Sequence, residues 1–230
     1  MNDHILKFEY LDHVFSFIKT PTAPDLIKEI FADNYHILQA VKDEKMSIRP
    51  GDVIVDAGAC EGMFSVLMSH SFPEARILAY EPVPSTYYNL VNNLELNGCK
   101  NVKAFNLGLG PNFKQRIEMI TNKDGQTGGS TALCTFNPEA HIKVEVGIIP
   151  LDAVFELNGI RRIRLLKMDI EGMEYDVLYS SQCLNSVDFF VGEFHINQRL
   201  EFESRRLDGL TNWVCNQTKC IFIQGCKMAE

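Results

Sequence analysis

The sequence predicts one α/β domain, in which a mostly parallel sheet carries helices on both faces. Two observations support this prediction: short β-branched runs alternate with helically periodic runs after residue 50, and the alternation resumes after residue 150. Such alternation is typical of a parallel sheet covered by helices. The chain has 230 residues, of which 46% are hydrophobic, so it is long and apolar enough to bury this core as a single domain.

Five segments are predicted to be strands, because each is a short apolar run of the kind buried on both faces of a sheet. They are DVIVDAG (52–58), RILAYEP (76–82), NVKAFNLGL (101–109), IRLLKMDIEG (163–172) and VDFFVGEFH (187–195). Helices are predicted in EGMFSVLMSH (61–70), PSTYYNLVNNLELNG (84–98), LDAVFELNG (151–159) and MEYDVLYSSQCL (173–184). We expect Asp152 to cap the third of these helices.

Both ends of the chain depart from the alternation. Residues 1–20 show helical spacing of apolar residues, and a second helical stretch covers 24–45, so we expect an N-terminal helical segment over about residues 1–50. The tail around 213–224 resembles a hairpin with its turn near 217–219.

Residues 111–150 interrupt the parallel pattern. Two polar/apolar alternators, QRIEMITN and HIKVEVGIIP, bracket the small-residue loop KDGQTGGSTAL (123–133). Alternation of this kind predicts an antiparallel insertion or flap. We expect its loop to close over a bound acceptor.

Composition excludes several classes of partner. The formal net charge of −8 and the absence of a Lys/Arg cluster disfavour nucleic acid. No apolar stretch has the length of a membrane helix, and the N-terminus lacks the pattern of a signal peptide. The seven cysteines are scattered and form no C-x-x-C pair, which is typical of reduced thiols. We therefore expect a cytoplasmic protein that binds neither membrane nor nucleic acid.

The turn after the first predicted strand points to a nucleoside cofactor. Gly58 and Gly62 lie between a strand and a helix, where a ligand can approach the backbone. Glu81 ends the next strand, where an acid accepts hydrogen bonds from a ribose. Cys60 occupies the position of the second glycine of a dinucleotide fingerprint, while Asp56 and Glu61 suit an ammonium group. S-adenosylmethionine, which is cationic and has no phosphate, fits this pattern.

Acidic side chains gather after the predicted strand at 163–172. Strand alternation places Lys167 with Glu193 and Asp169 with His195 if the two strands are neighbours, so we expect a Lys167–Glu193 ion pair. Glu171 and Glu174 fall in the first turn of the next helix, which favours acids. We assign Glu174 to that structural role alone, and the role of Glu171 stays open.

His195 is the candidate general base, with Asp169 as its partner. Both residues end strands at the carboxyl edge of the sheet, where ligands of such folds bind, and histidine titrates near neutrality. The alternative is a divalent-metal set of Asp169, Glu193 and His195, because carboxylate and imidazole suit several ions.

Seven motifs together resemble the FkbM-type S-adenosylmethionine-dependent methyltransferases over about residues 33–195. They are PGDVIVDAGACEGMFS, AYEPVPSTYYNLVNNLELN, NLGLG, GGSTAL, IPLDAVF, LLKMDIEGMEYDVL and VGEFH. The chain departs from the family at Cys60, where asparagine is common. The resemblance implies a Rossmann-like class I methyltransferase fold with seven strands. It also implies that Asp56, Gly58, Glu61 and Gly62 line the methionine end of the donor, that Glu81 holds its ribose and that Asn106 contacts its adenine.

The expected function is methyl transfer from S-adenosylmethionine to a hydroxyl of a sugar or secondary metabolite. The resemblance suggests the hydroxyl, while the residues themselves leave an amide nitrogen on a peptide open. A small molecule, glycan or peptide is thus the expected acceptor. Two other classes remain: a nicotinamide-dependent oxidoreductase and a binding protein that holds an adenosyl ligand without turnover.

Overall fold

The computed structural model describes residues 4–33, 37–111, 115–123, 136–196, 211–212 and 214–227. Its central sheet has the strand order β11-β10-β9-β3-β4-β5, with every neighbouring pair parallel. These strands are β3 (Val53–Ala57), β4 (Arg76–Tyr80), β5 (Val102–Phe105), β9 (Ile163–Met168), β10 (Val187–Ile196) and β11 (Lys219–Lys227). The Rossmann-like α/β class is confirmed, with six strands in this sheet among the described residues where seven were expected.

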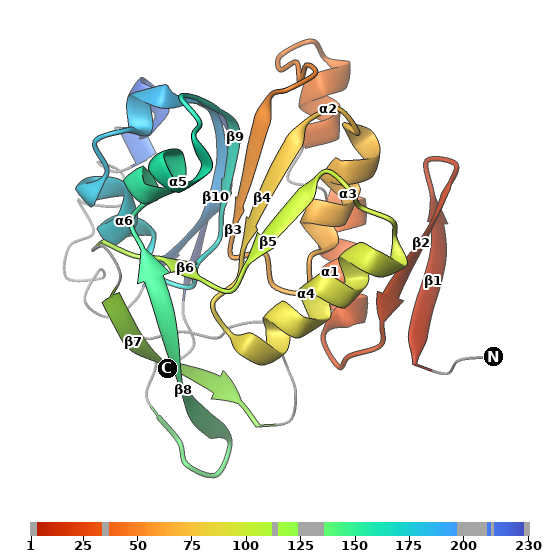
Figure 1. Ribbon diagram of the computed structural model, residues 1–230, viewed down its shortest axis with the longest axis vertical. Coiled ribbons are helices and arrows are strands. Elements are labelled where there is room, and N and C mark those ends of the chain that lie inside the picture. Colours follow the sequence, from red (N-terminus) through yellow and green to blue (C-terminus); the bar gives the residue numbers. More distant parts are fainter. Residues whose placement is uncertain are drawn as a thin grey trace.

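Helices cover both faces of the sheet (Figure 1). One face carries α1 (Ala23–Lys28), α2 (Ile37–Lys42), α3 (Met63–Ser71) and α4 (Pro84–Leu96). The other face carries α5 (Leu151–Asn158) and α6 (Glu174–Ser180), with a 3-10 turn at Leu184–Ser186. Alternate residues of each strand enter opposite layers, as when Ile54 packs in the first core and Val55 in the second. None of the described helices is long and apolar enough to cross a bilayer.

The order of the strands fixes where a ligand can bind. The chain runs outward from β3 to β4 and β5, and then returns to the opposite side of β3 with β9 and β10. Open α/β sheets bind ligands at the carboxyl ends of the strands where the order reverses, which here is the β3/β9 boundary.

The N-terminus is a β-hairpin, so the expected helix over 1–20 is wrong. β1 (Ile5–Tyr10) and β2 (His13–Ile18) pair antiparallel around a two-residue turn, and both turn residues, Leu11 and Asp12, have positive φ angles of 46° and 63°. Such a turn matches the twist of paired strands. Phe8 stacks on its cross-strand partner Phe15, with ring centroids 5.8 Å apart, and this pairing outweighs the helical spacing.

Asn93 of α4 and Asn97, the residue that caps the end of this helix, join the hairpin to the sheet domain. The Asn93 side chain accepts a hydrogen bond from the Ile18 N–H at 2.8 Å and donates one to the Glu61 carbonyl oxygen at 2.8 Å. Asn97 accepts from the Ser16 N–H and donates to the Ser16 carbonyl oxygen. After the hairpin, α1 continues into a π-helical turn at Glu29–Asp33.

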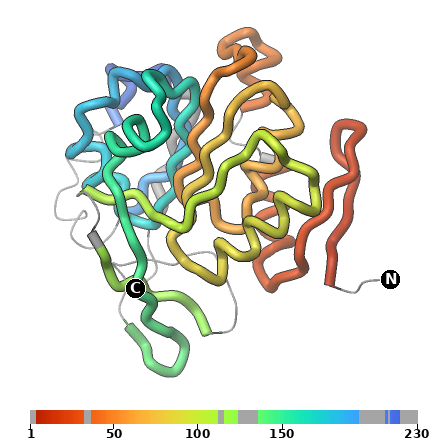
Figure 2. Tube along the Cα trace, in the orientation of Figure 1, coloured from red at the N-terminus to blue at the C-terminus, as the bar shows by residue number. Residues whose placement is uncertain are grey.

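The insertion lies beside the sheet and projects away from it (Figure 2). β7 (Gln115–Asn122) pairs antiparallel with β8 (His141–Ile149), and β8 also pairs with the short β6 (Gly108–Leu109). The expected closing loop lies largely in 124–135, outside the described residues.

Two further expectations are wrong. The tail forms no hairpin around 217–219: residues 214–217 are helical, and β11 then adds to the central sheet parallel to β10. Asp152 does not cap α5, whose N-cap is Pro150. Its carboxylate instead accepts hydrogen bonds from the Ser181 hydroxyl and from the backbone N–H groups of residues 182 and 183.

Candidate functional site

The glycine turn after β3 touches the end of β9. Gly58 has a φ of +76°, and a Cβ atom there would lie 1.8 Å from the Asp169 carbonyl oxygen, so backbone would overlap with side chain. Gly62 has a φ of +87°, and its Cβ would lie 2.4 Å from Leu90 Cδ1. Only glycine can combine the positive φ at Gly58 with the absence of space for a Cβ atom. Gly58 therefore lets the glycine turn approach the backbone of Asp169 closely.

Asp56 faces Lys167 inside the sheet. These residues are register partners on β3 and β9, and Lys167 Nζ lies 3.5 Å from Asp56 Oδ1 and donates to the Gly58 carbonyl oxygen at 2.7 Å. Burial alone would lower the pKa of Lys167, but Asp56 and Asp169 raise it to about 12. The expected Lys167–Glu193 pair is therefore replaced by a pair with the opposite neighbouring strand. Asp56 also accepts a hydrogen bond from the Ser65 hydroxyl, which links β3 to α3 across the glycine turn.

Glu81 is buried directly beside the glycine turn. Its two carboxylate oxygens accept hydrogen bonds from the Cys60 N–H at 3.0 Å and the Val83 N–H at 2.8 Å. Burial raises the pKa of Glu81 to about 8, although both N–H donors act in the opposite direction. Each oxygen of a carboxylate can accept a second hydrogen bond, so this geometry leaves Glu81 able to accept from a ribose diol.

Glu61 and Asn106 take different positions. Glu61 is fully buried and lines a small cavity of about 40 Å³ with Lys167 and Asp169. Asn106 is exposed and uses its side-chain NH₂ group to hold the carbonyl oxygens of Glu81 and Pro82. Its contact with adenine stays a prediction.

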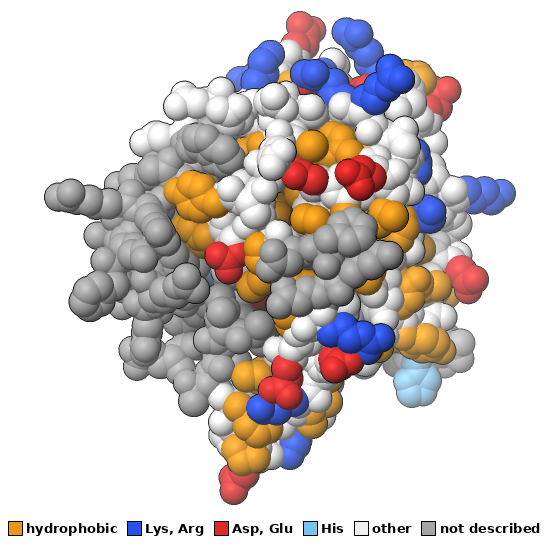
Figure 3. Space-filling model, turned by 60° about the vertical axis from the view of Figure 1, so that its left-hand side comes forward, with side chains coloured by type: hydrophobic (Ala, Val, Ile, Leu, Met, Phe, Trp, Pro, Cys, Tyr) orange, Lys and Arg blue, Asp and Glu red, His pale blue; other side chains and the backbone are white. Residues whose placement is uncertain are grey.

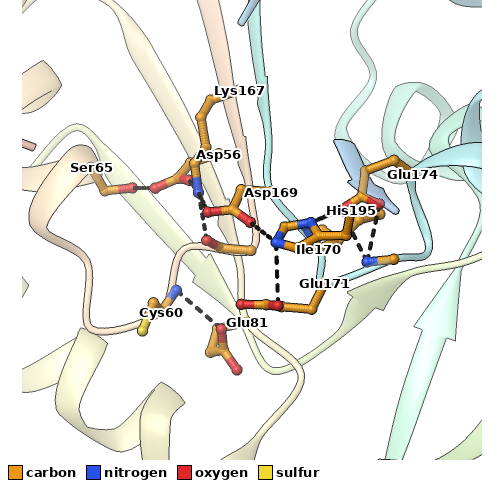
Figure 4. A network of polar contacts seen from close by, with 12 residues as sticks. Asp56, Cys60, Ser65, Glu81, Lys167, Asp169, Ile170, Glu171, Glu174 and His195 are labelled. Carbon is orange, nitrogen blue, oxygen red and sulfur yellow. Dashed lines mark hydrogen bonds and ion pairs between the residues drawn. The ribbon is translucent and has the colours of Figure 1, made fainter. Parts of the chain in front are cut away.

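His195 lies among three carboxylates (Figure 4). Its Nε2 atom is 3.3 Å from Glu171 Oε2 and 3.8 Å from Asp169 Oδ1, and its Nδ1 atom is 3.0 Å from Glu174 Oε1. Burial alone would lower the pKa of His195, but Glu174, Glu171 and Asp169 raise it to about 9. The three carboxylates thus favour the protonated imidazole, and a general base at this position would first have to release that proton.

Glu174 does more than the helix-start role assigned to it. It is completely buried, and its carboxylate accepts hydrogen bonds from the backbone N–H groups of Ile170 and Gly172 as well as contacting His195. Glu171 precedes α6 rather than lying in its first turn, with a φ of +55°. The sequence signal for this arrangement is Gly172, whose φ of +102° turns the chain so that Glu174 folds back on the strand end.

The predicted metal set also changes. The described residues that bring their ligand atoms together are Asp169, Glu171 and His195, whose atoms lie within 4.8 Å of one another. Glu171 thus takes the place expected for Glu193. Glu193 instead lines the same cavity as Asp169 and Glu171.

A cavity of about 210 Å³ connects these groups. Gly58, Cys60 and Glu81 line its donor side, and Asp169, Glu171 and Glu193 line the side next to His195. Apart from Glu29, the remaining wall is largely apolar and includes residues of the insertion, namely Ile117, Met119 and Ile148. Acidic and hydrophobic side chains likewise lie side by side near the middle of the face shown in Figure 3. The smaller cavity shares Gly58, Cys60 and Asp169, so the two adjoin.

Two solved structures match this chain weakly. Precorrin-6y C5,15-methyltransferase from Geobacter metallireducens GS-15 matches with a TM-score of 0.42 and 15% identity, over 76% of this chain and 70% of that one. TYW2 of M. jannaschii, solved in complex with AdoMet, matches with a TM-score of 0.30 and 12% identity, over 64% and 87% of the two chains.

Curated relatives are closer in sequence. Methyltransferase 1 of Beauveria bassiana (strain ARSEF 2860) is 32% identical over 167 residues, covering 66% of this chain and 64% of that protein. Methyltransferase sdnD of Sordaria araneosa is 31% identical over 180 residues, and 31-O-demethyl-FK506 methyltransferase FkbM of Streptomyces tacrolimicus is 28% identical over 178, each match covering 66% of both chains. The chain thus spans about two thirds of the length of these relatives.

The family model of the methyltransferase FkbM domain matches residues 56–216, from Asp56 in β3 to the helical residues before β11. This match decides against the nicotinamide-dependent alternative. The chain belongs to the FkbM methyltransferase family, whose methyl donor is S-adenosylmethionine.

Proposed function

We propose that the protein transfers a methyl group from S-adenosylmethionine to a hydroxyl group of a sugar or secondary metabolite. One observation supports this most: a single cavity is lined by Gly58 and Glu81 at one end and by Asp169 and Glu171, both in contact with His195, at the other. A hydroxyl acceptor must lose a proton as the methyl group arrives, and the cluster is the polar end of the cavity. The name of the Streptomyces relative, a 31-O-demethyl-FK506 methyltransferase, supports oxygen as the acceptor atom.

The donor would lie with its ribose at Glu81 and its methionine end toward Gly58, Glu61 and Gly62. The small cavity is lined by the carboxylates of Glu29, Glu61 and Asp169 and by the ammonium group of Lys167, so each charge of an amino acid moiety meets an opposite charge there. Asp56 then acts indirectly, because it holds Lys167 in place.

Acceptor and compartment follow from the same features. The apolar wall formed by Ile117, Met119 and Ile148 suits a partly hydrophobic small molecule, or a glycan or peptide carrying an apolar group. The formal net charge of −8 disfavours nucleic acid, and the free thiols of Cys99 and Cys183 fit the cytoplasm.

A matched acceptor panel tests the acceptor atom. We expect radiolabelled S-adenosylmethionine to label glycosides and macrolides with a free hydroxyl, and not the same molecules with that hydroxyl already methylated. Calorimetry of donor binding, run alongside, separates a wrong acceptor from an inactive preparation. Labelling that appears only on amide nitrogens would overturn the hydroxyl assignment and favour the N-methyltransferase alternative.

Donor affinity should depend on pH through Glu81. The ribose hydroxyls donate to an ionised carboxylate, and burial raises the pKa of Glu81 to about 8, so the binding-competent form becomes scarcer as pH falls below 8. Affinity should therefore rise with pH, by at most about tenfold per unit, and level off above about pH 8. Calorimetry from pH 6 to 9 measures this slope.

The Glu81→Gln variant should bind the donor weakly with a flatter pH profile. Glu95→Gln, on the exposed side of α4, is the matched control and should follow the wild type. If Glu81→Gln keeps the wild-type slope of donor affinity against pH, Glu81 is not the source of that slope.

A further inference from the structure

The cluster at the acceptor end of the cavity has the composition and spacing of a metal site. One oxygen each from Asp169 and Glu171 and the Nε2 atom of His195 lie within 4.8 Å of one another. Nε2 is 3.3 Å from the Glu171 oxygen and 3.8 Å from the Asp169 oxygen. An ion bound at about 2.1 Å holds neighbouring ligands about 3 Å apart and opposite ones about 4.2 Å apart, so small side-chain shifts suffice for binding.

The far side of the imidazole supplies independent support. His195 is only 7% exposed, and its Nδ1 atom lies 3.0 Å from a carboxylate oxygen of Glu174, which is 0% exposed. Histidines that bind metals typically donate the N–H of their other ring nitrogen to a carboxylate, which fixes the tautomer and the ring orientation. Glu174 lies outside the ligand group and directs the Nε2 atom toward Asp169 and Glu171.

The local charge favours a bound cation. Asp169, Glu171 and Glu174 bring three carboxylates to one imidazole, and the nearby ammonium of Lys167 also pairs with Asp56. A divalent ion would offset the repulsion between Asp169 and Glu171, both of which line the cavity.

We propose that Asp169, Glu171 and His195 bind one divalent metal ion, with Glu174 positioning the imidazole. The inference deepens the proposed function, because three ligands on one side leave positions open for water and for the acceptor hydroxyl. An imidazole with two carboxylates suits first-row ions such as Mn²⁺ or Zn²⁺.

A divalent ion held by these residues would lower the pKa of a hydroxyl bound to it. The proton leaves to solvent water, the hydroxyl oxygen forms a bond to the methyl carbon, and the bond from that carbon to the donor sulfur breaks. The sulfonium becomes a neutral thioether, and the charges balance with one proton released. In this arrangement His195 is a ligand, and its Nε2 atom binds the ion in place of a proton.

Mn²⁺ binding tests the proposal without any acceptor. Chelator-treated full-length protein should bind one Mn²⁺ per chain, measured by loss of the free-ion electron paramagnetic resonance signal, and the bound ion should show coupling to a histidine nitrogen. His195→Ala, Asp169→Asn and Glu171→Gln should each lose at least about tenfold in affinity. Glu174→Gln should weaken binding by about 10- to 100-fold, with a changed nitrogen coupling that a loss of folding alone would not produce.

Controls separate this site from its alternatives. Glu145→Gln removes an exposed acid of the insertion and should bind Mn²⁺ like the wild type. Binding that survives both His195→Ala and Asp169→Asn would overturn the site, and loss in Glu193→Gln but not in Glu171→Gln would overturn this ligand set.

Turnover distinguishes the two proposals. If hydroxyl methylation continues undiminished after chelation, the proposed metal site is contradicted and the proposed function stands. If Mn²⁺ binds with the expected pattern among the variants but methylation occurs only on nitrogen, the metal site stands and the proposed function is contradicted.

Discussion

His195→Ala is expected to lower methyl-transfer turnover by about 100- to 10,000-fold, the usual range for loss of a group that handles a proton in the rate-limiting step. The reason is positional: Nε2 of His195 contacts Asp169 and Glu171 at the acceptor end of the cavity, where the hydroxyl must lose its proton. The loss is expected whether His195 accepts that proton itself, as its sequence position predicts, or holds an ion that acidifies the hydroxyl. Steady-state kinetics on the identified acceptor measure it.

Donor affinity serves as the internal control for this variant. The imidazole contacts Asp169, Glu171 and Glu174, whereas the donor is proposed to lie at Glu81 and Gly58, so calorimetric affinity for S-adenosylmethionine should change little. His195→Gln keeps a side-chain amide that can face Glu174 and should lose turnover as well, while His4→Ala, an exposed position next to β1, should keep it. Full turnover in His195→Ala on the true acceptor would show that catalysis consists mainly of placing donor and acceptor in line.

Lys167→Met should destabilise the fold by about 3–5 kcal/mol, the range for removing one partner of a buried ion pair. The side chains of Lys167 and Asp56 are 5% and 0% exposed, so the substitution leaves a buried carboxylate without its cation and a Gly58 carbonyl oxygen without its donor. Urea denaturation followed by circular dichroism measures the free energy of unfolding.

An exposed pair provides the comparison. Arg162 also pairs with an aspartate, Asp188, but its side chain is 64% exposed, so Arg162→Met should cost no more than about 1 kcal/mol. In Asp56→Asn/Lys167→Met the loss should be smaller than the sum of the single losses, because no buried charge is orphaned. A Lys167→Met variant as stable as Arg162→Met would contradict the buried pair.

The central α/β sheet could be predicted from sequence because its strands are buried on both faces. In runs such as DVIVDAG and VDFFVGEFH, a strand buried on both faces is the arrangement that removes the β-branched and aromatic side chains from water. The N-terminal hairpin could not be predicted in this way, since Leu6, Tyr10 and Val14 satisfy a helical period by spacing alone. What decides the matter is tertiary packing: Phe8 and Phe15 pair across the strands and contact Phe31.

The same distinction holds for the candidate site. Alternation within strands placed Asp169 near His195, and the structure shows them 3.8 Å apart. A single strand does not reveal which neighbour its residues pair with, so the sequence predicts Glu193 on β10 as the partner of Lys167, whereas the structure pairs it with Asp56 on β3. The role of Glu174 depends on a turn at Gly172 that changes its direction, which helical periodicity cannot reveal.

The hydrogen bonds of Asn93 have an evolutionary consequence. They tie β2 to the Glu61 backbone, while Leu26 and Glu29 form part of the cavity wall, yet all of these N-terminal partners precede the FkbM domain match at residue 56. Part of the cavity wall therefore comes from residues that precede the matched FkbM domain. Exchange or drift within residues 4–33 can reshape the opening while Asp169 and His195 stay fixed. We therefore expect substitutions in this stretch to alter acceptor preference while the residues of the proposed site on β9 and β10 stay unchanged.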